Sequence, residues 1–422
     1  MKFSLLVILL SLSKITISQT IFDPKIYSKY VYKIDNINPL DTDYSDLEFL
    51  KRKLHNKQIL ILGENGHGDG SAFEAKTRLI KYLTTQLDFK TIAFEGGGFF
   101  EMYYASLNTN NQKDFFNEIQ NSWFEIWSNS IQTKALIDYL EQNKESINYF
   151  GIENQAGNKY WTDLPLILEN LIGNEVFNAV DYEGFKSNYL NFYNSIYIDT
   201  SFSSKVDISK LQMDLKRIKL NLSSIQNDHC KTMIQAIFNI EGFIQQIKLN
   251  FGTYSEQNQS ISLRDSLMTE NVKWWIENNP NQKLIIWTAN FHAADNLNQT
   301  MYAEGDDFYQ VMQPLGQRLK YAYDEKVFSM AFTSSEGKQA NIYEIEPTSI
   351  ISDTNSWEFE LSQGIKYDYA YVDFEKIKRK RKYRKYNFYS NLLGYKNRPG
   401  NWLNIFDSVF YIRTMTRSEM NK

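Results

Sequence analysis

A glycine-rich stretch, residues 63–70, contains a carboxylate and an imidazole three positions apart, Glu64 and His67. An imidazole takes up a proton near neutral pH, and a neighbouring carboxylate orients it and stabilises its charged form. The glycines that flank His67 allow positive φ values or a close approach of the backbone to a ligand. Because a histidine between glycines lies on no apolar helix face, we interpret His67 as a functional residue rather than a packed core residue.

Three other segments place polar side chains directly after apolar runs. Glu95 precedes three glycines, Glu153 follows a second run, and Asn290 and His292 follow a third. Two of the four histidines of the chain therefore belong to this set. A single glutamate after a strand also suits the first turn of a helix, where the macrodipole favours negative charge, and this is the alternative reading of Glu153.

The elements that must position these side chains are strands. Four apolar runs bounded by turn residues precede them: 58–62, 91–94, 148–152 and 283–288. They are apolar on both faces, as expected of parallel strands covered by helices, and a helical spacing over residues 71–87 joins the first two as a βαβ unit. Because ligands of open parallel sheets bind at the carboxyl ends of the strands, we expect the three carboxylates and two histidines to meet at one edge.

The middle of the chain, residues 161–278, carries long amphipathic stretches and no strand signals, which predicts a large helical insertion. Strand patterns then return at 327–332, 369–372 and 407–412. The predicted fold class is α/β, with a central, mostly parallel sheet flanked by helices. We expect residues 19–422 to form a single domain that contains this insertion.

Composition excludes several classes of protein. Lys and Arg number 46 against 50 Asp and Glu, and this charge of −4 disfavours a nucleic-acid binder, whose domain would be basic. The single cysteine, Cys230, excludes an intramolecular disulfide framework and a cysteine-based zinc cluster. One segment, Lys376 to Lys385, is dense in Lys and Arg, which indicates either a solvated loop or a patch for an anionic surface or polysaccharide.

The N-terminus predicts export. A lysine at position 2, an apolar run over residues 3–12 and small residues at 16–18 are typical of a secretory signal peptide, residues 1–18. Cleavage after Ser18 changes the net charge from −4 to −6, because it removes two lysines. No later segment approaches eighteen apolar residues, so we expect no membrane span and an extracytoplasmic protein, either periplasmic or secreted.

These residues resemble the erythromycin esterase family in three ordered motifs. The motifs are Ile59–Gly68 with Lys76, Arg78 and the Ile92–Glu95 strand end; Gly151–Gln155; and Leu263–Asn271 with Trp274, Trp275 and Ile286–Ala293. The resemblance runs from about residue 36 to the last strand and is weakest in the helical middle.

The resemblance implies hydrolysis of a macrolactone-like ester by histidine-activated water, without a covalent acyl-enzyme or an obligatory metal or other cofactor. It makes His67 the general base, with Glu64 and Glu95 orienting it or the water, and His292 polarising or positioning the ester. Lys76 or Arg264 would stabilise the oxyanion. Glu153 and Asn290 complete the expected substrate-binding set, and the expected partner is a small-molecule ester or lactone.

Two alternatives remain open from the sequence. Glu64, His67, Glu95 and His292 would suffice as ligands of a metal-dependent hydrolase, although no H-E-x-x-H helix supports that role. A non-catalytic protein that binds an apolar or polysaccharide ligand is the other alternative, with a pocket lined by aromatic side chains. Its candidate lining residues are Trp123, Trp127, Tyr160 and Trp161.

Overall fold

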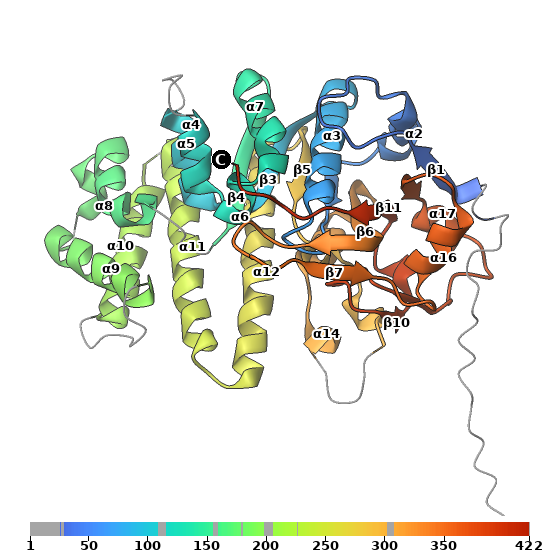
Figure 1. The fold of residues 1–422 in the computed structure, drawn as a ribbon. Coiled ribbons are helices and arrows are strands. Elements are labelled where there is room, and N and C mark those ends of the chain that lie inside the picture. Colours follow the sequence, from blue (N-terminus) through green and yellow to red (C-terminus); the bar gives the residue numbers. More distant parts are fainter. Residues whose placement is uncertain are drawn as a thin grey trace, which may run out of the picture.

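A computed structural model describes residue 26 and residues 29–108, 115–154, 159–178, 180–197, 206–225, 227–301 and 308–421. A large sheet with helices on both faces forms one part, and long helices extend from one end of it (Figure 1). The predicted signal peptide lies outside the described residues. No described helix is both long and apolar enough to cross a membrane.

The main sheet has the strand order β4-β3-β5-β2-β6-β11-β8-β1, and β7 pairs with the far end of β6. The first six strands in this order are parallel to one another, whereas β8, β1 and β7 pair antiparallel with their neighbours. The strands span Val31–Ile34 (β1), Ile59–Leu62 (β2), Phe89–Gly98 (β3), Asn148–Glu153 (β4), Lys283–Trp287 (β5), Val327–Gln339 (β6), Thr348–Ile351 (β7), Tyr369–Val372 (β8) and Ser408–Met415 (β11). Strand β5 lies between β2 and β3, although about 190 residues of chain separate it from β3.

Two hydrophobic cores cover the two faces of this sheet, as β2 illustrates. Ile59 and Ile61 join the core that contains residues of α12 (Tyr254–Asn278) and α15 (Leu315–Tyr323). Leu60 and Leu62 join the core that contains residues of α3 (Gly70–Gln86). All four side chains are fully buried, which explains why the sequence of β2 is apolar at every position.

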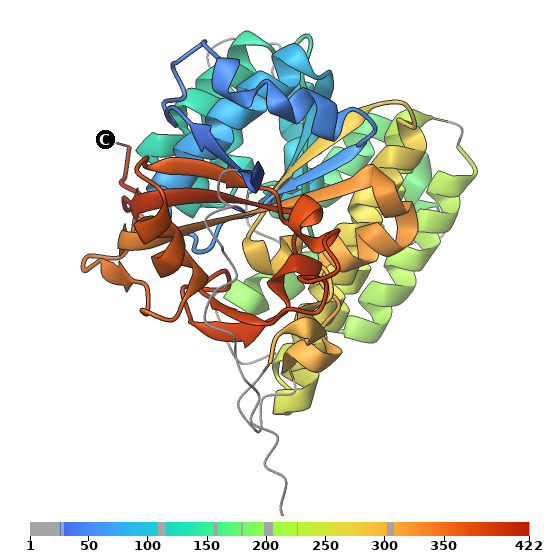
Figure 2. The same cartoon turned by 90° about the vertical axis from the view of Figure 1, so that its right-hand side faces the viewer.

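A third hydrophobic core lies within the helical part, away from the sheet. It joins α8 (Lys159–Ile172), α9 (Tyr182–Tyr197), α10 (Ile208–Ser223) and α11 (Asp228–Asn250). Helix α11 then packs along α12, which returns to the sheet and contacts β4 (Figures 1 and 2). A capping box of Thr253 and Glu256 starts α12 sharply after the turn.

The remaining described helices and strands are shorter and connect these layers. They are α2 (Phe49–Leu54), α4 (Phe99–Asn108), α5 (Phe115–Ser122), α6 (Glu125–Ser128), α7 (Lys134–Gln142), α13 (Asn290–Ala293), α14 (Phe308–Val311), α16 (Trp357–Gly364), α17 (Phe374–Lys378), β9 (Phe388–Ser390) and β10 (Arg398–Gly400).

The predicted fold class is confirmed, with differences at one edge of the sheet. Strands β1 and β7 were not predicted, and the predicted strand at 369–372 runs antiparallel to β11. Strand direction is set by the connection and not by the strand's own residues, so an apolar run cannot reveal it. The short strands β1 and β7 carry partly exposed or fully exposed positions and so lack the continuous apolar pattern of the central strands.

Candidate active site

His67 lies in the loop after β2, and its Nδ1 atom is 3.2 Å from Oε1 of Glu64. The Glu64 carboxylate is fully buried and accepts further hydrogen bonds from Lys76 Nζ and from Nε1 of Trp127, the latter at 3.0 Å. The Trp127 ring also meets the His67 ring edge-on, with centroids 4.9 Å apart. These contacts fix the imidazole so that Nε2 is the nitrogen left to act on a ligand.

Burial by itself lowers the pKa of His67, but its hydrogen bond to Glu64 and the nearby charge of Glu95 outweigh burial and raise that pKa. Burial also lowers the pKa of Lys76, against the opposing effect of Glu64. Lys76 is fully buried, with its Nζ also 3.0 Å from the carbonyl oxygen of Thr288 and 4.2 Å from the centre of the Trp287 ring. In this position Lys76 holds Glu64 in place instead of facing a substrate.

Glu95, at the end of β3, accepts four polar contacts through its two oxygens. Oε2 accepts from Thr288 Oγ1 and from the backbone N–H of Ala289, both at 2.7 Å. Oε1 lies 3.2 Å from Arg264 and 3.2 Å from Nε2 of His292. Burial alone would raise the pKa of Glu95, but the charges of His292 and Arg264 hold it well below its usual range.

Arg264, on α12, bridges the ends of two strands. Its Nε lies 3.0 Å from Oε2 of Glu153, its Nη2 binds both Glu153 and Glu95, and its Nη1 lies 2.9 Å from Nε2 of His292. Glu153 is buried and its other oxygen accepts from the backbone N–H of Asn154 at 3.1 Å. Glu153 is therefore an ion-pair partner at this site and not a solvated first-turn residue.

His292, on α13, binds Asp265 through the ring nitrogen that faces away from Glu95. Asp265 is the neighbour of Arg264 in sequence. Nδ1 of His292 lies 2.8 and 3.0 Å from the two carboxylate oxygens of Asp265. Asp265 is fully buried and also accepts from the backbone N–H of Leu315 at 2.8 Å. Burial lowers the pKa of His292, but the charges of Asp265 and Glu95 overcome that effect and raise it to about 10.

Asn290 joins the loops of the site through backbone contacts. Its side-chain amide donates to the carbonyl oxygens of Phe332 and Leu392 at 2.8 and 2.9 Å, and its oxygen accepts from Phe332 N–H at 3.0 Å. A Cβ atom at Gly63 would meet Oδ1 of Asn290 at 2.2 Å, so the close approach of these loops requires glycine there. Because its amide is fully used, Asn290 positions the site and does not contact substrate through this group.

A buried carboxylate under the His67 loop fixes its backbone. Asp69 accepts hydrogen bonds from the N–H groups of Asn65 and Gly66 at 3.1 and 2.9 Å, and from the hydroxyl of Tyr395 at 2.8 Å. Burial raises the pKa of Asp69 to about 7. The turn that presents His67 is thus anchored to the C-terminal part of the chain.

The His67 side chain is much more exposed to solvent than the groups that surround it. The His67 side chain is 43% exposed, against 16% for Arg264 and 6% for His292. Glu64, Glu95 and Glu153 are at most 1% exposed. The arrangement therefore presents one accessible imidazole backed by a carboxylate, beside a buried cluster of paired charges, which suits transfer of a proton from a bound water molecule.

The structure brings together all of the predicted site residues, but two of them do not face the substrate side as predicted. Lys76 and Asn290 lie behind the site and not on its open side. Two contributing residues were missed: Asp265, which sits next to the predicted Arg264 on a helix, and Trp127 on α6. Asp265 had a sequence signal, since it lies within the Arg-Asp motif, whereas Trp127 had none that linked it to Glu64.

The geometry bears on the two alternatives, a metal-dependent hydrolase and a non-catalytic binding protein. Among the described residues, no group of three or more His, Cys, Asp or Glu side chains is arranged to hold a metal ion. Glu64 and Glu95 instead hold the cations of Lys76 and Arg264. Trp123 and Trp127 are 1% exposed and stack on each other in the core, so they do not line an open binding surface, and the side chains of Tyr160 and Trp161 lie outside the described residues.

A sequence model of the erythromycin esterase family, described as "Erythromycin esterase", matches residues 85–401, which is more than two thirds of the chain. The chain belongs to the erythromycin esterase family. The match includes Glu95, Glu153, Arg264 and His292, while Glu64 and His67 precede its first residue.

Two relatives of the chain carry hydrolase names. The chain is 27% identical over 284 residues to YbfO of Bacillus subtilis (strain 168), named provisionally as a hydrolase, and the match covers 60% of this chain and 61% of that protein. It is 22% identical over 337 residues to erythromycin esterase type II of Escherichia coli, with 73% and 76% covered.

Solved structures share the fold. A protein titled as a succinoglycan biosynthesis protein superposes with a TM-score of 0.73 at 21% identity, covering 94% of this chain and 98% of that one. A mutant of erythromycin esterase EreC in its open conformation gives a TM-score of 0.62 at 16% identity, covering 90% and 96%. At these identities the superpositions establish the fold alone.

Proposed function

We propose that this member of the erythromycin esterase family hydrolyses a carboxylic ester or lactone with water activated by His67. The observation that carries the proposal is the accessible His67 imidazole, whose Nδ1 faces the buried carboxylate of Glu64 at 3.2 Å. The family and the two relatives with hydrolase names support the reaction class. A macrolide-like lactone is the substrate class that the erythromycin esterase relative suggests.

In this mechanism His67 donates its Nδ1–H to Glu64 and takes a proton from water at Nε2. The resulting hydroxide attacks the carbonyl carbon, and the carbonyl π electrons move to oxygen in a tetrahedral intermediate. The C–O bond to the alcohol then breaks, and protonated His67 returns its proton to the leaving oxygen. A carboxylic acid and an alcohol result, with no acyl-enzyme and no cofactor.

The cations beside His67 suit the negative charge that develops on the carbonyl oxygen. Arg264 and protonated His292 both point their nitrogens toward Glu95 at the same end of the sheet. The raised pKa of His292 keeps it positively charged at neutral pH, when it can stabilise an oxyanion. Base catalysis contributes about 10²–10⁴-fold and one oxyanion donor about 10²–10³-fold, so orientation of the ester and the water in the site must supply the remainder.

The test is the substitution His67→Asn, with His55→Asn as the matched control. His55 is an exposed histidine after α2, far from the strand ends that hold the site. Both purified variants and the parent chain are incubated with macrolides, simple lactones and aryl esters, and products are identified by the mass gain of one water. We expect His67→Asn to lose at least 10³-fold in turnover with an unchanged circular dichroism spectrum, and His55→Asn to keep full activity. Equal turnover in His67→Asn and the parent chain would remove His67 as the base.

The proposal includes export to an extracytoplasmic compartment, periplasmic or secreted, with antibiotic inactivation as one role there. The basic, apolar and small-residue segments at positions 1–18 support export. Mass spectrometry of the protein recovered outside the cytoplasm should show a chain that begins at Gln19. A full-length chain confined to the cytoplasm would contradict this part of the proposal and leave the hydrolytic reaction untouched.

A further inference from the structure

A dense group of cations lies outside the site, on the segment we call the basic strap, residues 376–385. Five of its side chains are exposed and form no ion pair with any carboxylate in the described part of the chain. They are Lys380, Arg381, Lys382, Arg384 and Lys385. Such a density of unpaired like charge costs free energy through mutual repulsion, and an anionic partner would relieve that cost.

The strap is fixed to the fold and is not a loose solvated loop. Ile377 and Tyr383 are buried in the core that also contains Val372 and Phe388. Asp373 caps α17 by accepting from the backbone N–H of Lys376 at 2.9 Å. Because buried side chains hold the strap on its inner side, its cations are presented together on the outer side.

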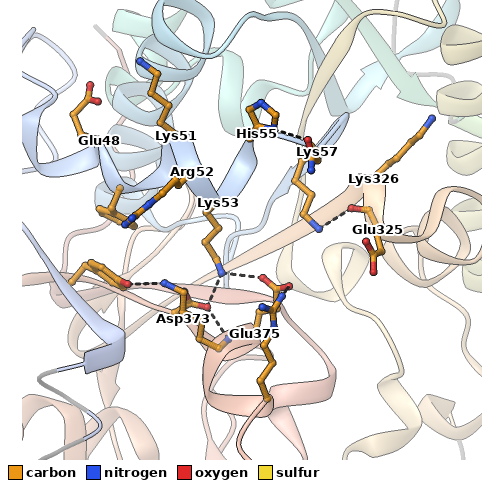
Figure 3. A pocket seen from close by; sticks show the side chains of 15 residues that line it. Glu48, Lys51, Arg52, Lys53, His55, Lys57, Glu325, Lys326, Asp373 and Glu375 are labelled. Atoms are coloured by element: carbon orange, nitrogen blue, oxygen red, sulfur yellow. Dashed lines mark hydrogen bonds and ion pairs between the residues drawn. The ribbon is translucent and has the colours of Figure 1, made fainter.

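A groove beside the strap pairs some of its cations with its own carboxylates. Its volume is about 1340 Å³, and seven cationic and four acidic side chains line it (Figure 3). Lys53 of α2 reaches down to Asp373 at 2.7 Å and Glu375 at 3.0 Å, and Arg379 pairs with Glu375 at 2.7 Å. The other four cations of the groove form no ion pair among the described residues, so the groove adds positive charge beside the strap. They are Lys51, Arg52, Lys57 and Lys326.

We propose that the basic strap docks the protein onto an anionic phospholipid surface. Clusters of four to eight exposed Lys and Arg side chains are the pattern that anionic bilayers attract. Long, flexible cationic side chains on an outward-facing segment can all reach one plane, which is the geometry that a bilayer surface presents. The net charge of the whole chain is −4, so the strap concentrates positive charge on a chain that is acidic as a whole.

The strap starts at the end of the sheet opposite the candidate active site. The strap starts after β8, whose end lies beside the beginning of β11, as the contact from Glu375 N–H to the Asp407 carbonyl at 2.8 Å shows. His67, Glu95 and His292 follow the opposite, carboxyl ends of the parallel strands. In Figure 1, α17 lies at the end of the molecule far from the helical part.

The test measures binding of the full chain to sedimenting vesicles of phosphatidylcholine alone, or of phosphatidylcholine and phosphatidylglycerol in a two-to-one ratio. The strap variant is Lys380→Gln, Arg381→Gln and Lys382→Gln combined. The matched control replaces three exposed lysines elsewhere by glutamine, Lys216, Lys248 and Lys338. Both variants change the net charge equally, so only the place of the charge differs.

We expect the parent chain and the control to bind the anionic vesicles, and the strap variant to bind at least tenfold more weakly. Each cation near the surface contributes about fivefold, so three predict about 150-fold at low salt. Raising the salt from about 0.05 M to about 0.5 M should release the parent chain. Absence of binding by the parent chain, or equal loss in both variants, would overturn the proposal. Equal binding to phosphatidylcholine alone would also overturn it, because it would show apolar attachment, and binding to immobilised heparin without vesicle binding would assign the strap to polysaccharides instead.

Discussion

The substitution Asp265→Asn tests most directly the ion pair between Asp265 and His292. Asparagine keeps the size of the side chain and can still accept from the N–H of Leu315. It places an amide N–H or a neutral oxygen where His292 Nδ1 now meets a carboxylate at 2.8 Å. The imidazole then loses the neighbouring charge that keeps it protonated at neutral pH, and Nε2, which faces Nη1 of Arg264 at 2.9 Å, can give up its proton.

The expected loss of folding stability in Asp265→Asn follows from the pKa of His292. That pKa is about 10 in the folded protein, against 6.5 for a free histidine, so Asp265 and Glu95 together stabilise the protonated form by on the order of 5 kcal/mol. Because the folded pKa is raised, the stabilisation is complete below pH 6.5 and is lost as the pH rises through 10. Between pH 7 and pH 10 the contribution falls by about 1.4 kcal/mol for each pH unit.

Three measurements check this reasoning. The chain has only four histidines, so the imidazole C2–H signals can be followed individually by NMR during a pH titration. We expect His292 to titrate near pH 10 in the parent chain and several units lower in Asp265→Asn. Ester turnover at pH 7 should fall by about 10²–10³-fold, the contribution of one oxyanion donor. Urea unfolding should show the largest loss of stability at pH 6 and little above pH 10. An unchanged His292 titration, or a stability loss that does not vary with pH, would refute the role given to Asp265.

Three further outcomes follow from the site. Lys76→Met should lower the free energy of unfolding by about 3–5 kcal/mol, because it leaves the buried Glu64 without its cation, whereas Lys81→Met on the partly exposed side of α3 should cost less than about 1 kcal/mol in urea unfolding. In a pH–rate profile, kcat/KM should rise with pH through a value above 6.5, since His67 must be neutral to accept a proton and its pKa is raised; a rate that falls over this range would contradict a histidine base. Exhaustive chelation, checked by elemental analysis, should leave turnover unchanged, and activity that returns only with added zinc or manganese would favour the metal-dependent alternative.

The central strands and the meeting of the catalytic candidates were predictable from the sequence. Buried parallel strands leave continuous apolar runs, and their carboxyl ends lie at one edge, so Glu64, Glu95 and His292 were expected to come together. The structure adds partners that arrive from helices. Asp265 lies on α12 and Trp127 on α6, and no local pattern tells which strand end a helical side chain will reach.

The sequence also could not show which polar side chains of the site are buried. Lys76 carries a charge, and charged side chains are usually exposed, so a role facing the substrate was the natural prediction. The structure instead buries it completely between Glu64 and the Trp287 ring. Asn290 shows the same limit, because the backbone groups that occupy its amide belong to residues 42 and 102 positions away.

The placement of β5 between β2 and β3 has a consequence for biosynthesis. A nascent chain that has emerged only as far as the helical part already holds β2, β3 and β4, but the slot between β2 and β3 is vacant, with unpaired backbone groups on both sides. Truncated products that end before residue 283 would therefore leave strand edges unpaired on β3 and on both sides of β2, because β6 also comes later, and such edges promote aggregation. Arrival of the five-residue strand β5 fills this slot, and α13 with His292 follows it directly, whereas the other edge of β2 stays unpaired until β6 has been made.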